Sequence, residues 1–319
     1  MKKGLLVAAA TVFVLFMAGG GLMLYSKNSP GQEQVTPPVP ISTENSRPAP
    51  ALPAGSDRET GRETAKVAEP DPNSGQQSPV AARPQATAQA LTDNEKLSWY
   101  YKPNKEHKLP EVNPRGKALL EKYNGIYHGD TGAKNIYLTF DEGYENGYTP
   151  KILDTLQEAG IKAAFFITGD YLRKHPDLVK RMVQEGHLVG NHTDRHPSLP
   201  QISDAAVIKE IQSVSDSFAQ LTGASMKYLR PPMGEYSERT LKLTRDLGYR
   251  HVFWSVALVD WRPDAGTPEQ NHNTVMERLH NGAVILLHAV NKANAEMLAD
   301  LIKDCQAQGY RFASLDEIR

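Results

Sequence analysis

The sequence contains a single cysteine, Cys305, among 319 residues. One cysteine cannot form an internal disulfide, and it excludes a metal site built from several thiolates. The charges are nearly balanced, with 36 Lys and Arg residues against 37 Asp and Glu residues. A chain with this balance has no general electrostatic attraction for a phosphate backbone, so we expect no nucleic-acid partner.

Aromatic residues are absent between Tyr25 and Trp99, and this stretch holds eleven of the 22 prolines. Such a segment cannot bury enough apolar surface to offset the entropy lost on ordering. We therefore expect a disordered linker over residues 28–96 and a folded domain over residues 97–319. A plain spacer is the simpler interpretation of the linker, and a segment that binds a partner is the alternative.

Charged residues are also absent from the apolar run 4–25, which follows Lys2 and Lys3. The run has about the ~20 residues that cross a bilayer, and the preceding lysines favour an N-terminus that stays inside. We expect residues 1–27 to form a transmembrane signal anchor in the cell membrane, with the rest of the chain outside. A cleavable signal peptide and a secreted protein are the alternative, because small residues follow a shorter apolar core.

From residue 136 onward, apolar runs of strand type alternate with helical patterns. The expected strands cover residues 136–140, 163–168, 187–190, 226–229, 251–259, 283–290 and 311–315. The expected helices cover residues 151–160, 176–186, 204–223, 238–248, 267–280 and 294–309. Thr149 with Pro150, Ser203 and Ser237 are the expected helix starts. The alternation predicts an α/β fold with a parallel sheet, and about seven units favour a barrel over an open sheet.

Five polar stretches follow the ends of five expected strands. They are "DEG" after 136–140, "NHTDRH" after 187–190, "RPPMG" after 226–229, "DW" after 251–259, and His288 near the end of 283–290. The carboxyl ends of parallel strands lie at one edge of an α/β fold, where active sites are built. We therefore expect these stretches to converge in space.

Asp141 and Glu142 are adjacent acids at the first of these strand ends. Neighbouring side chains on a strand point to opposite faces, so both can serve one site only if the chain leaves strand geometry there. Gly143 makes such a turn easy. The alternative is a pair of solvated loop acids.

His192 and His196 are four residues apart, which on a helical turn places two imidazoles on one face. Two imidazoles and one carboxylate form a three-ligand set of the kind found in catalytic zinc sites. Surface histidines are the alternative for such a spacing. An acidic partner at a neighbouring strand end favours the metal site.

Arg230 precedes two prolines, which hold its backbone extended. Its guanidinium could pair with Asp141 or Asp260 and keep that carboxylate ionised; a surface salt bridge is the alternative. His288 follows an apolar strand, where a buried structural histidine is the ordinary case. Beside a metal site it becomes a candidate proton donor.

Taken together, "TFDEG", "HTDRH", "RPPMG", "VDW" and "LLH" resemble the five motifs of the polysaccharide deacetylases, carbohydrate esterase family 4. The resemblance covers about residues 136–319 and implies a distorted (β/α)7 barrel. Within the family, "YLTFDEGYENGYTPK", "YLRPPMG" and "VFWSVALVDW" are most similar to peptidoglycan N-deacetylases that act on muramic acid during δ-lactam formation in the spore cortex.

The resemblance assigns roles position by position. The implied catalytic residues are Asp141 as base, His288 as acid, and Arg230 and Asp260 as the residues that hold them. The implied ligands of a divalent cation, expected to be zinc, are Glu142, His192 and His196. The implied substrate contacts are the Met233 backbone N–H, Trp261 and Leu286. Glu142 departs from the family pattern, which has an aspartate there, so its longer side chain must fold back to reach the ion.

The resemblance thus predicts a metal-dependent hydrolase that removes the N-acetyl group from muramic acid in peptidoglycan glycan strands. Two alternatives stay open. The first is an N-acetylglucosamine deacetylase acting on peptidoglycan or chitin. The second is a membrane-tethered glycan-binding module that has lost hydrolysis through the change to Glu142.

Overall fold

The computed structural model describes residues 93–262 and 265–319. The predicted anchor, 1–27, and the predicted linker up to residue 92 lie outside the described residues. In the part of the chain that the structure describes, no helix combines the length and apolar character of a membrane span.

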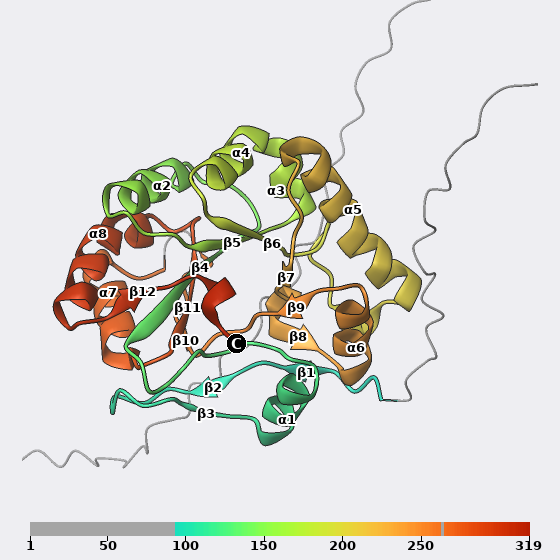
Figure 1. Cartoon of the computed structure of the whole chain (residues 1–319), viewed down its shortest axis with the longest axis horizontal. Helices are drawn as coiled ribbons and strands as arrows, with labels where there is room; N and C mark the ends of the chain where they lie inside the picture. The colour runs from blue at the N-terminus through green and yellow to red at the C-terminus, as the bar shows by residue number, and fades with distance from the viewer. Residues whose placement is uncertain (1–92, 263–264) are drawn as a thin grey trace, which may run out of the picture. The chain divides into compact units, whose positions relative to one another are not determined.

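A curved parallel sheet forms the centre of the fold (Figure 1). Its strands, in spatial order, are β10 (Val256–Ala257), β11 (Val284–His288), β4 (Asn135–Glu142), β5 (Ala164–Ile167), β6 (Leu188–Asn191), β7 (Tyr228–Leu229) and β9 (Arg250–His251). Every neighbouring pair is parallel, and β12 (Arg311–Phe312) adds to β4 outside this path. The predicted α/β class with a parallel sheet is confirmed.

The two edge strands, β9 and β10, are consecutive in the chain but do not pair with each other among the described strands. Only four residues separate His251 from Val256, so the sheet must curve until its edges approach. The prediction of one continuous strand over 251–259 is wrong for this reason. Ile126 bridges to Val252 on one edge, and His128 bridges to Ala283 beside the other. The result is a half-barrel rather than a ring closed by strand pairing.

In residues 93–262 and 265–319, seven α-helices accompany the sheet, and Figure 1 shows them around its outside. They are α2 (Thr149–Glu158), α3 (Gly169–Lys174), α4 (Pro176–Gln184), α5 (Asp204–Thr222), α6 (Glu238–Asp246), α7 (Pro268–Arg278) and α8 (Lys292–Ala307). Ser203 and Ser237 cap α5 and α6 with their side chains, as predicted. Thr149 is not a cap, because it is the first residue of α2, and Tyr148 occupies the cap position without a side-chain bond.

The two faces of β4 bury different clusters. Ile136, Leu138 and Phe140 face the helices and join the largest apolar cluster of the described residues. Tyr137 lies on the opposite, inner face with residues of the neighbouring strands. Thr139 and Asp141 share that inner face, because side chains alternate along a strand. Polar side chains inside the half-barrel therefore need partners there.

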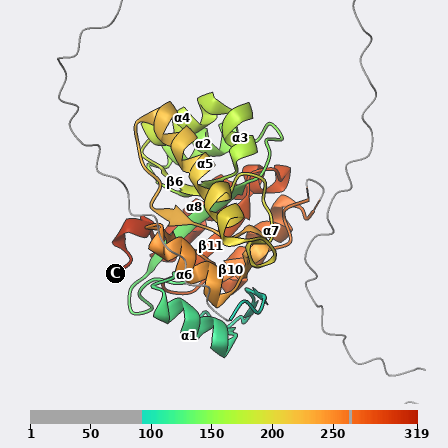
Figure 2. The same ribbon diagram turned by 90° about the vertical axis from the view of Figure 1, so that its right-hand side faces the viewer.

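An N-terminal arm covers the gap between the two sheet edges. It comprises β1 (Leu97–Ser98), β2 (Tyr101–Lys102), β3 (Glu111–Val112) and α1 (Pro114–Lys122), with β1 pairing to β8 (Glu235–Tyr236). The Trp99 ring is tilted against Tyr127 and Phe253, with ring centroids 5.0 and 4.9 Å away, and its indole N–H donates to the Trp254 carbonyl at 2.9 Å. In both views α1 lies on the far side of the sheet from α2 and α4 (Figure 1, Figure 2).

Candidate active site

The inner face of the half-barrel gathers polar side chains where the strands end. Asp141 of β4 lies in register with His288 of β11, and Thr139 lies in register with Leu286. All four positions face the same side because their spacing along each strand is two residues. Two of the five predicted strand ends are therefore immediate neighbours.

Arg230 crosses the inside of the half-barrel and holds Asp141. Its side chain is fully buried, and its guanidinium donates to Asp141 Oδ1 at 2.6 Å and to Thr139 Oγ1 at 2.9 Å. Its Nε donates to the Val252 carbonyl at 3.1 Å, and its Cζ lies 4.2 Å from the centroid of the Phe166 ring. The surface salt bridge that the sequence left open is excluded, and of the two predicted carboxylate partners the structure selects Asp141.

The Asp141 carboxylate stays ionised despite its burial. Burial by itself raises its pKa, but the charge of Arg230 and its hydrogen bond, together with His288, outweigh that effect and leave the pKa below its usual value. An ionised carboxylate beside a substrate can accept a proton. The alternative of a solvated loop acid does not apply to a side chain this deeply enclosed.

His192 and His196 lie together at the end of β6, with ring centroids 4.8 Å apart and nearly perpendicular. They do not sit on a helical turn as expected. The segment is a loop, in which Thr193 and His196 both adopt positive φ angles of 68° and 60°. The Asn191 side chain accepts from the Thr193 N–H at 2.8 Å, and this short loop replaces the expected helix in bringing the imidazoles together.

His192 has a defined tautomer. Its Nδ1 lies 2.8 Å from the Arg230 carbonyl, which can only accept, so Nδ1 carries the proton and Nε2 faces Asp141 Oδ2 at 3.5 Å. Burial lowers the pKa of His192, and it lowers that of His196 to about 3. Both imidazoles are therefore neutral at pH 7, which is the form that binds a metal ion.

His288 pairs with Asp260 rather than with the histidine pair. Its Nδ1 lies 2.8 Å from Asp260 Oδ1, and its backbone N–H donates to Oδ2 at 2.9 Å. Burial alone lowers the pKa of His288, but the adjacent Asp260 carboxylate more than offsets this and raises it above its ordinary value. The Nε2 edge of the ring remains for a substrate, as a proton donor requires.

Glu142 does not join this group. Strand β4 continues through Glu142 without leaving strand geometry, so its side chain points to the helix side, away from Asp141. Its Oε2 lies 3.5 Å from the Thr149 hydroxyl, and its Oε1 has no hydrogen-bond partner among the residues that the structure describes. Burial, together with the negative charges of Glu145 and Asp141, raises its pKa well above the ordinary value.

The predicted ligand set of Glu142, His192 and His196 therefore does not fit a metal ion as the side chains stand. In the described ranges, 93–262 and 265–319, no three His, Cys, Asp or Glu side chains have the mutual placement of a metal site. The two imidazoles have suitable donor chemistry. The carboxylate predicted to complete the set lies behind the strand.

The three predicted substrate contacts lie around the same rim. Leu286 is buried on the inner face two residues before His288, and the Trp261 ring lies 6.2 Å from the His288 ring. Met233 sits in the short helix η2 (Pro232–Gly234) with φ 58° and ψ 8°. A left-handed conformation is uncommon for a residue with a side chain, and it sets the direction of the Met233 N–H.

Sequence reasoning missed the residues that support this rim. The Asn294 side chain, at the start of α8, donates to Asp260 Oδ2 at 2.5 Å, and Asn271 of α7 donates to Asn294 Oδ1 at 2.9 Å. Thr139, inside β4, accepts from Arg230 and donates to the Ile285 carbonyl at 2.7 Å. A lone threonine in a strand or asparagine in a helix carries no distinguishing pattern, apart from the cost of burying its polar group.

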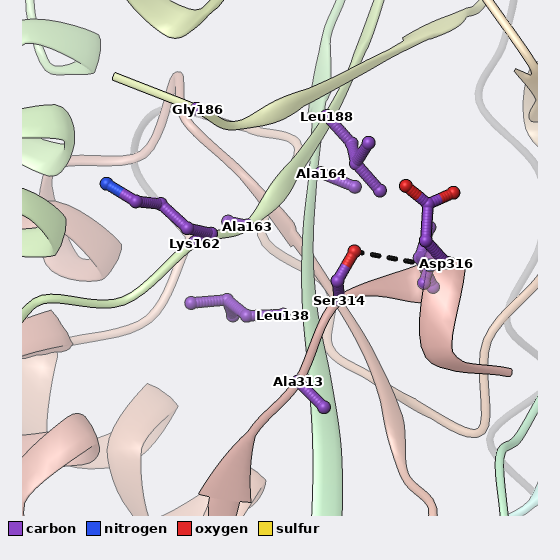
Figure 3. Close-up of a pocket in the computed structure, with 10 residues that line it drawn as sticks. Leu138, Lys162, Ala163, Ala164, Gly186, Leu188, Ala313, Ser314 and Asp316 are labelled. Atoms are coloured by element: carbon purple, nitrogen blue, oxygen red, sulfur yellow. Dashed lines mark hydrogen bonds between the residues drawn. The ribbon is translucent and has the colours of Figure 1, made fainter.

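A separate cavity of about 160 Å³ lies at the opposite end of the strands (Figure 3). Its lining residues come from the beginnings of β5 and β6 and from the segment after β12. They include Lys162, Ala164, Leu188 and Ser314. The cavity lies near the amino ends of β5 and β6, whereas the candidate site lies at the carboxyl ends of β4 and β11. The cavity is therefore not part of the candidate site.

The fold and the site define a hydrolase-type centre, with a held carboxylate, a histidine pair and an Asp–His pair at the rim of a parallel half-barrel. A family model described as polysaccharide deacetylase matches residues 128–252. An uncharacterized 30.6 kDa protein of Geobacillus stearothermophilus is 47% identical over 235 residues, which cover 72% of this chain and 87% of that protein.

The chain is similar in both sequence and structure to one protein of Bacillus subtilis. The peptidoglycan-N-acetylmuramic acid deacetylase PdaA of Bacillus subtilis is 43% identical over 235 residues, covering 73% of this chain and 89% of that protein. The solved structure of Bacillus subtilis PdaA, described as a family 4 carbohydrate esterase, matches with a TM-score of 0.69 over 70% of this chain and 97% of that chain. The chain belongs to the polysaccharide deacetylase family, which confirms the family and the enzyme class that the five motifs predicted.

Proposed function

We propose that this enzyme removes the N-acetyl group from muramic acid residues of peptidoglycan, as the first step toward muramic δ-lactam. The observation that carries the proposal is the arrangement of Asp141, held by Arg230, opposite His288, held by Asp260. The name of the Bacillus subtilis relative, at 43% identity over most of its length, supports muramic acid as the substrate.

The residues act in sequence on the acetamido group. Asp141 takes a proton from water as the water oxygen bonds to the acetyl carbon, and the carbonyl π electrons move to the carbonyl oxygen. The Met233 N–H is the proposed donor to that oxygen, a type of contact worth about 3–4 kcal/mol in other amide-cleaving enzymes. The C–N bond then breaks with its electron pair on nitrogen, and His288 supplies the proton that completes the amine. Acetate is the second product.

Leu286 and Trp261 are the proposed contacts for the acetyl methyl and the sugar. Leu286 faces the same side as the proposed acid, and Trp261 lies beside it. An apolar side chain next to the reacting carbonyl also excludes water, which strengthens the electrostatic interactions of Asp141 and His288. These contacts orient the acetamido group between base and acid.

The test is acetate release from purified glycan strands that contain N-acetylmuramic acid, with and without their stem peptides. We expect release from the muramic residues and loss of more than about 10²-fold in rate in Asp141→Asn, which keeps the size of the side chain but cannot accept the proton. Mass analysis of the products identifies the sugar. Acetate lost only from N-acetylglucosamine would overturn the substrate, and full activity in Asp141→Asn would overturn the base.

Members of this family generally depend on a divalent cation, and zinc is the cation we propose here. His192 and His196 are the proposed donors. Because Glu142 points away from them, the third protein ligand of the predicted set is not in place. Equilibrium zinc binding to chelator-treated protein tests this part independently of turnover.

We also propose that residues 1–27 hold the enzyme at the outer side of the cell membrane, next to its glycan substrate. The support is the uncharged run 4–25 behind Lys2 and Lys3. Fractionation of cells that produce the full chain is the test. Recovery in the membrane fraction supports an anchor, and a shortened soluble protein in the medium supports signal cleavage.

A further inference from the structure

We propose that Asn294, supported by Asn271, is a positioning residue for the Asp260–His288 pair and thereby for protonation of the departing amine. The inference rests on the proposed function and adds residues to it. Neither asparagine belongs to the five motifs, and both come from helices outside the sheet.

Asp260 is a fully buried carboxylate whose orientation depends on few donors. Oδ1 accepts from the His288 ring at 2.8 Å, while Oδ2 accepts from the His288 backbone at 2.9 Å and from Asn294 Nδ2 at 2.5 Å. Two of these donors, the ring N–H and the backbone N–H, belong to His288, which is the residue that Asp260 orients. Among the described residues, Asn294 therefore supplies the contact to this buried carboxylate that does not come from His288 itself.

The Asn294 amide is itself fixed in one orientation. Its Oδ1 accepts from Asn271 Nδ2 at 2.9 Å, so its Nδ2 must be turned toward Asp260, and the same nitrogen donates to the His288 carbonyl at 3.1 Å. Both asparagines are buried. Gly266 leaves room for this contact, since a Cβ at that position would lie 2.1 Å from Asn271 Oδ1.

The chemistry of the leaving group makes this role measurable. When His288 Nδ1–H is held by Asp260, Nε2 is the atom that gives its proton to the sugar nitrogen as the C–N bond electrons move there. An activated aryl ester loses a phenolate that needs no proton. A residue that acts through His288 must therefore matter for the amide and not for the ester, whereas general damage to the fold lowers both activities.

The experiment compares Asn294→Ala and Asn271→Ala with the unaltered enzyme on acetylated glycan and on 4-nitrophenyl acetate. For Asn294→Ala we expect kcat on the glycan to fall about 10–100-fold, as for other residues that orient an active-site group, with KM and ester hydrolysis changed less than about threefold. Asn271→Ala should show a weaker effect of the same kind. Asn273→Ala, an exposed asparagine on the same helix, is the matched control and should change neither rate.

Equal losses on both substrates, or no loss on the glycan, would overturn the inference. His288→Ala in the same assays separates it from the proposed function. If His288→Ala spares the amide reaction, the proposed acid is wrong; if only His288→Ala discriminates between substrates, Asn294 has no positioning role. Should Asn294→Ala fail to fold, Asn271→Ala decides, because it leaves Asn294 in place.

If the unaltered enzyme does not cleave the ester, the NMR signal of the His288 Nδ1 proton decides: a shift in Asn294→Ala supports the inference, and an unchanged signal overturns it.

Discussion

At the scale of single residues, the Asp260–His288 pair predicts how activity depends on pH. Asp260 raises the pKa of His288, so His288 keeps its proton at a pH where a free imidazole has lost it. Asp260→Asn removes the charge at nearly constant size and lowers that pKa. Because a general acid works only while protonated, we expect the alkaline limb of the kcat/KM profile on acetylated glycan to move to lower pH.

Asp260→Asn also replaces one acceptor oxygen by an NH2 group, and the other residues around His288 are unchanged in this variant. Asp141 and Arg230 also act on His288, as do His192 and His196 across the rim. The control is Asp304→Asn, which alters a different Asp–His pair, 3.0 Å from His272 on the surface of α7 and α8. An alkaline limb that stays in place in Asp260→Asn would show that another group supplies the proton.

Glu142 yields a prediction about metal binding. Since its carboxylate points to Thr149 on the helix side of β4, we expect Glu142→Gln to keep the zinc affinity of the enzyme within about twofold. Loss of an imidazole donor in His192→Ala should weaken binding more than about tenfold, in the range seen when a metal site is disturbed. Competition with a chromophoric chelator measures both affinities. A tenfold loss in Glu142→Gln would mean that the side chain swings to the inner face when zinc binds.

The sequence could not have settled the direction of Glu142. It showed two adjacent acids before a glycine, and the prediction required the chain to turn at once so that both faced one site. In the structure β4 continues through Glu142, and the Thr149 and Tyr171 hydroxyls provide a polar environment on the outer face. Those contacts join residues 142, 149 and 171, which no local pattern connects.

At the scale of elements, the N-terminal arm attaches to the domain through a buried aromatic side chain, Trp99. Trp99 is buried between Tyr127 and Phe253 at the gap between the sheet edges. Trp99→Ala leaves a cavity there, and such changes cost about 3–5 kcal/mol in the free energy of unfolding. Chemical denaturation followed by circular dichroism measures the loss.

The adjacent aromatic residue provides the control. Tyr100 is 58% exposed, so Tyr100→Ala should change the free energy of unfolding by less than about 0.5 kcal/mol. A similar small effect for Trp99→Ala would show that the arm does not seal the gap. Comparable large losses in both variants would instead point to an unfolding of β1 as a whole.

The order of strands and helices was predictable because apolar periodicity and helix caps are local properties. The long patterns at α5 and α8 and the caps Ser203 and Ser237 show this. The six-residue helix α3 was missed, since it follows β5 directly and depends on the Thr168 hydroxyl accepting from the Tyr171 N–H. The division of 251–259 between two sheet edges was also missed, because apolar residues line both edges and only the topology separates them.

At the scale of the whole molecule, one consequence of the half-barrel is that the site needs both sheet edges at once. Arg230 follows β7 and donates to Val252 beyond β9, whereas Asp260 follows β10 on the other edge. The segment between β9 and β10 joins the part of the site that contains Arg230 to the part that contains Asp260. The N-terminal arm packs against this segment. Trp99 of the arm packs on Phe253 and donates to the Trp254 carbonyl, both of which lie in the segment between β9 and β10.

The start of the folded unit is the last feature that can be tested at this scale. The expected boundary is residue 97, but the residues just before it already contact the domain. The Asn94 side chain donates to the Pro200 carbonyl at 2.8 Å and accepts from the Ser237 hydroxyl at 2.8 Å, and the Asp93 carbonyl accepts from the Arg239 N–H at 3.2 Å. These bonds tie the beginning of the arm to the start of α6 and to the segment before α5.

We therefore expect a chain truncated to residues 93–319 to match the full-length protein in the free energy of unfolding of its catalytic domain. Truncation to residues 97–319 should lower it by about 1–3 kcal/mol, because the Ser237 hydroxyl and the Pro200 carbonyl each lose the hydrogen bond to Asn94. Denaturation of both forms in urea measures the difference. Asn94→Ala in the longer form should reproduce part of the loss, and equal stability of the two truncated forms would place the boundary at residue 97 after all.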